Sequence, residues 1–172
     1  MKKLQLTLTI AFIISGIFTK AAHAQDKPSL PEIKSPVVIE LFTSQGCPSC
    51  PPADKILSEL AENPNVITLG CHVSYWNHLE WKDTLSNDFC DIRQHGIQGL
   101  RGERRIYTPQ MVVNGKYVFV GTNTAKLSFA LDMAQKSELL AIKAESADDN
   151  LITITLPVAD KNESRLWGYG YK

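Results

Sequence analysis

Two cysteines, Cys47 and Cys50, stand two residues apart where a strand-like pattern gives way to a helix-like one. The preceding run, residues 37–42, is β-branched and mostly apolar, which is typical of a buried strand. After the pair, apolar residues recur at helical spacing between 56 and 60. A helix that follows a strand presents unpaired N–H groups and the positive end of its dipole at its first turn. We therefore expect the Cys47 thiol to have a lowered pKa and to react as a thiolate.

A cysteine pair with this spacing and context predicts thiol–disulfide exchange. Cys50 lies one helical turn beyond Cys47, so an exposed Cys47 attacks a foreign disulfide and a shielded Cys50 resolves the mixed disulfide. This chemistry needs no organic cofactor. A static disulfide and a metal site are the alternatives. A copper- or zinc-binding module would use the same two cysteines with His72, although zinc usually takes a second close pair, and Cys71 and Cys90 are far apart in the sequence.

Prolines around the pair predict where the helix begins. Proline has no N–H to donate, and this loss costs nothing in the first turn of a helix. Pro51 and Pro52 fit that turn, so we predict that the regular helix begins at about Pro51. The N–H groups of Ser49 and Cys50 are then expected to donate to the Cys47 sulfur.

The rest of the chain predicts an α/β sandwich around a mixed four-stranded sheet. The element order is β-α-β-α-β-β-α with flanking helices and a short C-terminal β extension. The strongest local signal is Asn114-Gly115, which supplies the positive φ angles of a two-residue hairpin turn. The other expected elements are a strand at 66–73, a helix from Thr84 to about Gln98, hairpin strands at 110–113 and 116–120, a helix from Thr124 to about Leu140, a polar stretch at 145–150 and a last strand at 151–157.

The first 24 residues are predicted to be a secretory signal peptide. Lys2 and Lys3 precede an apolar run from Leu4 to about Phe18, and Ala22-His23-Ala24 provides a cleavage site. The run is shorter than the roughly 20 residues that a spanning helix needs. We expect an exported protein, periplasmic or secreted, in a compartment where disulfides persist.

Charge and length bound the mature chain. Removal of the signal takes three lysines from 18 basic residues and leaves 15 against 18 acidic ones, so nothing indicates nucleic acid or, after cleavage, a membrane as a partner. Residues 25–36 are polar and proline-rich and predict a leader arm. Residues 37–140 form one domain, and residues 141–172 a linker with the C-terminal β extension.

Three long stretches resemble a known family: "VVIELFTSQGCPSCPPAD", "HVSYWNHLEWKD" and "RRIYTPQMVVNGKYVFVG". They are similar to the exported thioredoxin-like bacterial family catalogued as domain of unknown function 1223, and the likeness runs from about Val37 to Leu140. The resemblance implies a thioredoxin-like fold over residues 37–140. It also implies protein or small-molecule disulfides and thiols as partners, and a degenerate interaction protein on the same fold is the alternative.

The resemblance also assigns roles to individual residues. It implies that Cys47 is the attacking thiol and Cys50 the resolving one. It implies a cis peptide bond before Pro109, facing the cysteine pair, with the Thr108 backbone available to pair with a substrate strand. Relatives have a longer β-rich tail, so we expect the last strand to lack its partner, and a truncated chain is one interpretation of the short end.

Four further residues have both a functional and a structural interpretation. Glu40, a buried acid on the first strand, is either a proton relay for the resolving thiol or a structural ion-pair partner. His72 either tunes the thiolate or is a core histidine. Cys71 and Cys90 either form a second disulfide or remain free buried thiols.

Overall fold

The computed structural model describes residues 30–78, 81–137, 142–148 and 151–155. The predicted signal peptide lies outside these residues. Among the helices in the described ranges, none has the length and apolar character that crossing a membrane requires. The elements are β1 (Val37–Thr43), α1 (Pro51–Leu60), β2 (Val66–His72), α2 (Asp88–Leu100), β3 (Gln110–Val113), β4 (Tyr117–Val120), α3 (Thr124–Gln135), β5 (Lys143–Asp148) and β6 (Leu151–Thr155).

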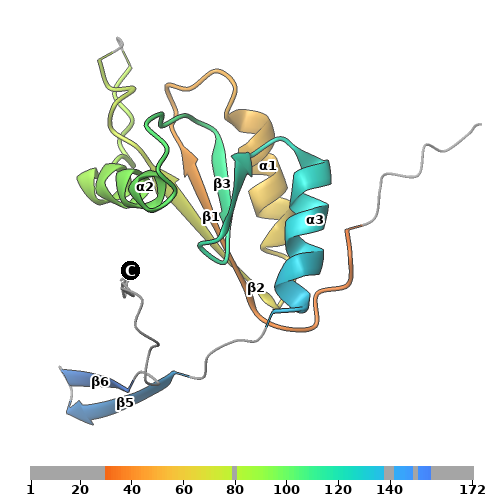
Figure 1. Cartoon of the computed structure of the whole chain (residues 1–172). Helices are drawn as coiled ribbons and strands as arrows, with labels where there is room; N and C mark the ends of the chain where they lie inside the picture. The colour runs from red at the N-terminus through yellow and green to blue at the C-terminus, as the bar shows by residue number, and fades with distance from the viewer. Residues whose placement is uncertain (1–29, 79–80, 138–141, 149–150, 156–172) are drawn as a thin grey trace, which may run out of the picture.

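The main sheet has the strand order β2-β1-β3-β4. Strand β1 pairs in parallel with β2 and antiparallel with β3, which continues into β4. Helices α1 and α3 cover one face and α2 covers the other (Figure 1). This arrangement confirms the predicted mixed four-stranded sheet with flanking helices.

Strand β1 is central, and it carries large apolar side chains on both faces. Ile39 and Leu41 point to the α1–α3 side, where they pack with Ala53 of α1 in the larger apolar cluster. Phe42 points to the opposite side and packs with Cys71 and the rest of a second apolar cluster. Alternate residues of a strand face opposite sides of the sheet, so one strand supports both layers.

The β3–β4 hairpin turns at the predicted dipeptide. Asn114 and Gly115 have φ angles of 49° and 66°. The predicted two-residue loop is wrong, because Val113 pairs with Tyr117 and three residues lie between the strands. Asn114 also bonds to β1: its N–H donates to the Val38 carbonyl and its Oδ1 accepts the Val38 N–H, both at 2.8 Å. The turn residue therefore extends the β3–β1 ladder.

Helix α2 begins later than its predicted start at Thr84. Its N-cap is Asn87, whose side chain accepts the Phe89 N–H at 2.9 Å. Asp83 fixes the segment between Thr84 and Asn87, because its Oδ1 accepts the Leu85 N–H at 2.9 Å. An Asx side chain that bonds the backbone two residues on offers an alternative to the first helical turn.

The polar stretch predicted at 145–150 is in part a strand. Residues 143–148 form β5, which pairs antiparallel with β6 in a separate two-stranded sheet. The expectation that the last strand lacks a partner is therefore wrong. The sequence of β5, KAESAD, consists of small and charged residues and lacks the apolar signal by which strands are usually recognised.

The part of the leader arm that the structure describes is attached to the domain. Ile33 is buried in the larger apolar cluster. The N–H groups of Lys34 and Ser35 both donate to the side-chain oxygen of Gln135, at 2.7 and 2.8 Å. These bonds join the start of β1 to the end of α3.

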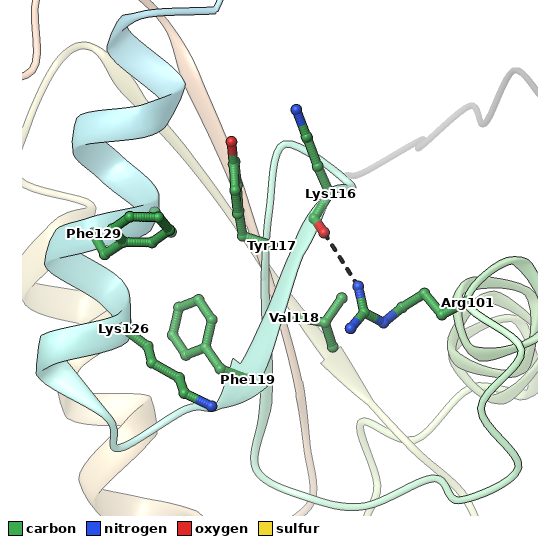
Figure 2. Close-up of a pocket in the computed structure, with 8 residues that line it drawn as sticks. Arg101, Lys116, Tyr117, Val118, Phe119, Lys126 and Phe129 are labelled. Atoms are coloured by element: carbon green, nitrogen blue, oxygen red, sulfur yellow. Dashed lines mark hydrogen bonds between the residues drawn. The ribbon is translucent and has the colours of Figure 1, made fainter.

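A hollow of about 260 Å³ lies at the β4 edge of the main sheet, between β4 and α3 (Figure 2). Tyr117 meets Phe129 of α3 edge-on, with 6.2 Å between ring centres. Arg101, which caps the C-terminus of α2, donates to the Lys116 carbonyl at 3.4 Å. The hairpin turn is thus tied to α2 as well as to β1.

Gly121 follows β4 where three elements converge. A Cβ at this position would lie 2.9 Å from Ala53 Cβ, 3.0 Å from Leu41 Cδ1 and 3.3 Å from Pro109 Cβ. Its N–H donates to the Pro109 carbonyl at 2.9 Å. Only a glycine lets α1 and the proline loop approach so closely.

Gly121→Ala is therefore expected to lower the free energy of unfolding by roughly 1–3 kcal/mol, the usual cost of overpacking. Urea unfolding followed by circular dichroism measures the change. The matched control is Gly99→Ala in α2, where no atom lies within 4 Å of the added Cβ. This control should stabilise the helix by roughly 0.5–1 kcal/mol. Equal stability of Gly121→Ala and the wild type would contradict the close packing.

Candidate active site

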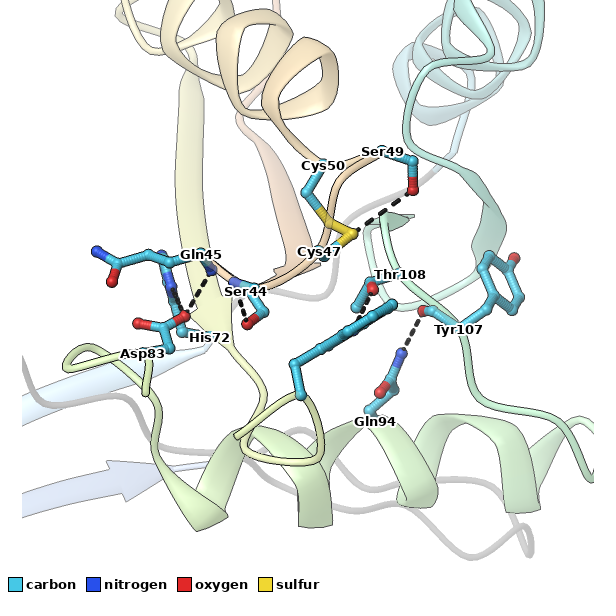
Figure 3. The surroundings of a disulfide bond; sticks show 12 residues. Ser44, Gln45, Cys47, Ser49, Cys50, His72, Asp83, Gln94, Tyr107 and Thr108 are labelled. Carbon is cyan, nitrogen blue, oxygen red and sulfur yellow. Dashed lines mark hydrogen bonds and ion pairs between the residues drawn. A yellow bond between two sulfur atoms is a disulfide. The ribbon is translucent and has the colours of Figure 1, made fainter. Parts of the chain in front are cut away.

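The cysteine pair lies at the N-terminus of α1 and is disulfide-bonded (Figure 3). The strand-to-helix loop is a series of tight turns, in which the Cys47 N–H donates to the Ser44 carbonyl at 3.1 Å. Cys50 is the N-cap of α1, and its carbonyl accepts from the Ala53 and Asp54 N–H groups. The helix begins at Pro51, as the prolines predicted.

Two expectations about the Cys47 sulfur are wrong in this disulfide form. Cys47, expected to be exposed, has only 2% of its surface accessible, and Cys50 has none. The Cys50 N–H donates to the Cys47 carbonyl at 3.2 Å rather than to its sulfur. The group that contacts the sulfur is the Ser49 hydroxyl, at 3.5 Å. Trp76 packs against the loop, since a Cβ at Gly46 would lie 3.3 Å from Trp76 Cβ.

The Thr108-Pro109 segment lies beside the disulfide, where Figure 3 draws Thr108 near Cys47. The peptide bond between Thr108 and Pro109 is cis. The Thr108 hydroxyl accepts the Trp76 indole N–H at 2.8 Å. Gln94 of α2 donates its side-chain amide to the Tyr107 carbonyl at 2.8 Å. Trp76 and Gln94 therefore hold the proline loop from the α2 side.

His72 belongs to a hydrogen-bond chain that reaches the cysteine loop. Its Nδ1 lies 2.7 Å from Asp83 Oδ2. The same carboxylate oxygen accepts the Gln45 N–H at 2.8 Å, two residues before Cys47. His72 therefore acts on the cysteine loop through Asp83, which fits a role in positioning the loop.

Asp83 is only 1% exposed, and burial alone would raise the pKa of its carboxyl. The Gln45 N–H, the His72 ring and the Leu85 N–H outweigh burial and lower the pKa below its usual value. A folded-state pKa below the unfolded one stabilises the protein above the unfolded value, and this stabilisation is lost as the pH falls through the folded value.

Asp83→Asn is therefore expected to lower the melting temperature at about pH 6 and to matter less as the pH falls below about 4, where the carboxyl of the unfolded chain takes up a proton before that of the folded protein. Thermal unfolding of both proteins across this range measures the difference. The control is Lys34→Met, which removes an exposed partner of Glu32. This variant should leave the melting temperature unchanged at both ends of the pH range. A difference that grows toward acid pH would contradict the lowered pKa.

Glu40 is buried in an ion pair on the other face of the sheet. Arg93 of α2 donates its Nε and Nη2 to the two carboxylate oxygens, both at 2.8 Å. Neighbouring Ile39 and Leu41 face α1, so Glu40 points away from the helix that carries the cysteines. This placement matches the structural-partner interpretation and not a proton relay beneath Cys50.

Cys71 and Cys90 form a second disulfide, which joins β2 to the first turn of α2. Both half-cystines are buried, at 5% and 7% exposure. Their Cα atoms are 5.4 Å apart, within the range that a bridge requires.

The alternative metal site is not assembled in the described part of the chain. Those residues contain no group of three or more histidine, cysteine or acidic side chains able to hold an ion. His72 is engaged with Asp83 instead of the cysteine pair.

Sequence reasoning missed Asp83 and Arg93, and for Ser49 it expected a role of the backbone N–H and not of the hydroxyl. Arg93 had a detectable signal, because it falls on the same helical face as the buried residues Cys90 and Ile97. An arginine on a buried face requires a buried acid opposite, and Glu40 was the available candidate. Ser49 and Asp83 had no comparable signal, since serine and aspartate are common in loops.

Known proteins share this fold and this region of sequence. The chain is 32% identical to a probable thioredoxin of Archaeoglobus fulgidus over 85 residues, which are 49% of this chain and 74% of that protein. It is 33% identical to a thioredoxin of Methanocaldococcus jannaschii over 91 residues, 52% of this chain and 85% of that one. These likenesses and the disulfide-bonded cysteines support a thioredoxin-like redox role.

A solved structure is also similar. An Agrobacterium tumefaciens protein determined by X-ray crystallography matches with a TM-score of 0.60 and 35% identity over 67% of this chain. The match covers 54% of that protein, so this chain spans about half its length. The model of a family described as "Protein of unknown function (DUF1223)" matches residues 38–169. The chain therefore belongs to the DUF1223 family and has a thioredoxin-like fold.

Proposed function

We propose that this protein is an exported thiol–disulfide oxidoreductase that acts by dithiol–disulfide exchange at Cys47 and Cys50. The observation that carries the proposal is the disulfide between them at the first turn of α1, with the Thr108-Pro109 loop beside it. The proposal of export rests on the signal peptide that the sequence predicts at residues 1–24.

In the reduced protein, the Cys47 thiolate attacks one sulfur of a partner disulfide and releases the other as a thiolate. Cys50 then attacks Cys47 in the mixed disulfide, so the partner leaves with two thiols and the Cys47–Cys50 bond forms. The partner gains two electrons and the pair loses two. The reverse sequence oxidises a partner dithiol.

The Ser49 hydroxyl is suited to stabilise the Cys47 thiolate. Its oxygen lies 3.5 Å from this sulfur, and Ser49 is exposed. The hydroxyl proton can turn toward a negatively charged sulfur, because its position is free to rotate. The first turn of α1 adds the positive end of the helix dipole.

The partner is expected to approach along the Thr108-Pro109 loop. Thr108 is half-buried, and its side chain is already held by Trp76. A fixed loop backbone lets an extended partner segment pair with it at a small entropic cost. Cys47 is almost fully buried in the disulfide form. A dithiol partner must therefore also shift the atoms that cover the Cys47 sulfur before it can react.

The redox potential of the pair tests the proposal. The protein is equilibrated with dithiothreitol or glutathione buffers, and free thiols are alkylated and located by mass spectrometry. Trypsin places Cys47 and Cys50 together on residues 35–55, apart from the other cysteines. Exchange-active pairs have midpoints between roughly −270 and −120 mV. A midpoint below about −300 mV would identify a structural disulfide and reject the proposal.

A further inference from the structure

Strand β2 is the terminal strand of the main sheet, and its outer edge is open in the described part of the chain. The His72 carbonyl points outward, where it accepts the Asn87 N–H at 3.0 Å. Backbone groups alternate along a strand, so Gly70 and Thr68 present their N–H and C=O groups to the same outer edge. No strand of the described residues pairs with them.

A groove of about 530 Å³ runs beside this edge. One wall is the α2 side of β2, where Ile67, Leu69 and Cys71 alternate on one face. The other wall comes from the segment before α2 and its first turn, with Leu85 and Cys90 among its residues. The two walls meet at the Cys71–Cys90 bond. The disulfide is therefore part of the groove lining.

The groove is lined mainly by apolar side chains and is open to solvent. Ile67 and Leu85 are 53% and 60% exposed. Among the described residues that line the groove, none is acidic, and His72 is the one residue with a basic side chain. Large apolar side chains at an open strand edge fit an extended apolar segment that adds a strand to the sheet.

The disulfide in this groove is no less accessible than the one at α1. Cys71 and Cys90 are 5% and 7% exposed, against 2% and 0% for Cys47 and Cys50. Cys90 lies in the first turn of α2, whose N–H groups favour an anion. Asp88 and Asp91 share that turn, and the Ser74 N–H donates to the Asp91 carboxylate at 3.0 Å.

From these observations we propose that Cys71–Cys90 is a second exchangeable disulfide, whose partner is an extended apolar peptide segment carrying cysteine thiols and docked along the edge of β2. The proposal goes beyond the proposed function, because it does not require exchange at Cys47. The bridge also links β2 to α2, so its reduction removes the covalent link between the sheet and that helix.

The reaction balances with a thiol partner. A partner thiolate attacks the Cys71 sulfur, which breaks the Cys71–Cys90 bond and releases the Cys90 thiolate. A second partner thiolate attacks the first partner sulfur and releases Cys71, and water supplies protons to the thiolates formed here. The partner loses two electrons and becomes a disulfide, while Cys71 and Cys90 gain them.

The test uses the wild-type chain without denaturant. The probe is a five-residue peptide of valines around a central cysteine, with both ends blocked, and the reference thiol is 2-mercaptoethanol. After an acid quench and alkylation, tryptic peptides 56–82 and 83–93 report Cys71 and Cys90 separately. At equal thiolate concentration, the peptide should reduce the pair about ten times faster than the reference.

Two lysine variants test the docking site. Leu85→Lys places a charge in the groove and should slow reduction by the peptide about fivefold, while reduction by 2-mercaptoethanol is unchanged. Ile92→Lys is the matched control, because Ile92 is equally exposed, at 61%, and does not line the groove. It should leave both rates unchanged.

Three results would overturn the proposal: thiols at Cys71 and Cys90 that appear only when urea unfolds the chain, equal rates for the peptide and the reference, or equal effects of the two lysine variants. The first would identify a structural bridge. Since peptide 35–55 is measured in the same samples, failure here is distinguishable from failure of the Cys47–Cys50 proposal.

Discussion

Replacement of Cys47 by serine is expected to lower the rate of disulfide exchange at this pair by roughly three orders of magnitude or more. A hydroxyl is far less acidic than a thiol, so the variant has no anion able to attack a partner sulfur at neutral pH. Reduction of a fluorescent disulfide peptide, followed over time, measures the loss. Exchange at Cys71–Cys90 is removed from the comparison when both proteins carry Cys71→Ser and Cys90→Ser.

Cys50→Ser should behave differently from Cys47→Ser. The first step still occurs, but no thiol remains to resolve the mixed disulfide, so the partner stays attached to Cys47. Non-reducing electrophoresis and mass spectrometry detect this adduct. Ser58→Ala, on the exposed side of α1, is a control that should retain exchange. Exchange that survives Cys47→Ser, or an adduct on Cys50, would reject Cys47 as the nucleophile.

Arg93→Met is expected to lower the free energy of unfolding by roughly 3–5 kcal/mol. The variant leaves the Glu40 carboxylate in the sheet–α2 interface without the guanidinium that bonds both its oxygens. Arg93 and Glu40 have side-chain exposures of 9% and 4%, so water compensates for little of the loss. Urea unfolding at neutral pH measures the change.

The double variant Glu40→Leu with Arg93→Met should recover most of this stability, because an apolar pair removes the buried charge as well as its partner. The control is Lys136→Met, which breaks the exposed pair with Asp132 and should cost no more than about 0.5 kcal/mol. A double variant that is less stable than Arg93→Met alone would show that loss of the ion pair, and not the buried carboxylate that Arg93→Met leaves behind, determines the effect.

Local features of this sequence determined the position of the Cys47–Cys50 pair. Pro51 begins α1, and the cysteines fall between β1 and that helix as predicted. Asn114-Gly115 marks the hairpin turn. Such features depend on neighbouring residues, since proline lacks an N–H and the turn needs positive φ angles. The element order and the mixed sheet follow from the same local patterns.

Tertiary structure decided which distant groups meet. Arg93 and Glu40 are 53 positions apart, and only the packing of α2 on the sheet brings them together. Asp83 reaches Gln45 across 38 positions, and the loop of Cys47 depends on that bond. The accessibility of each sulfur is also a product of packing, which explains why the expected exposure of Cys47 was wrong. Local sequence sets backbone conformation, but burial and pairing depend on contacts between segments that are remote in the chain.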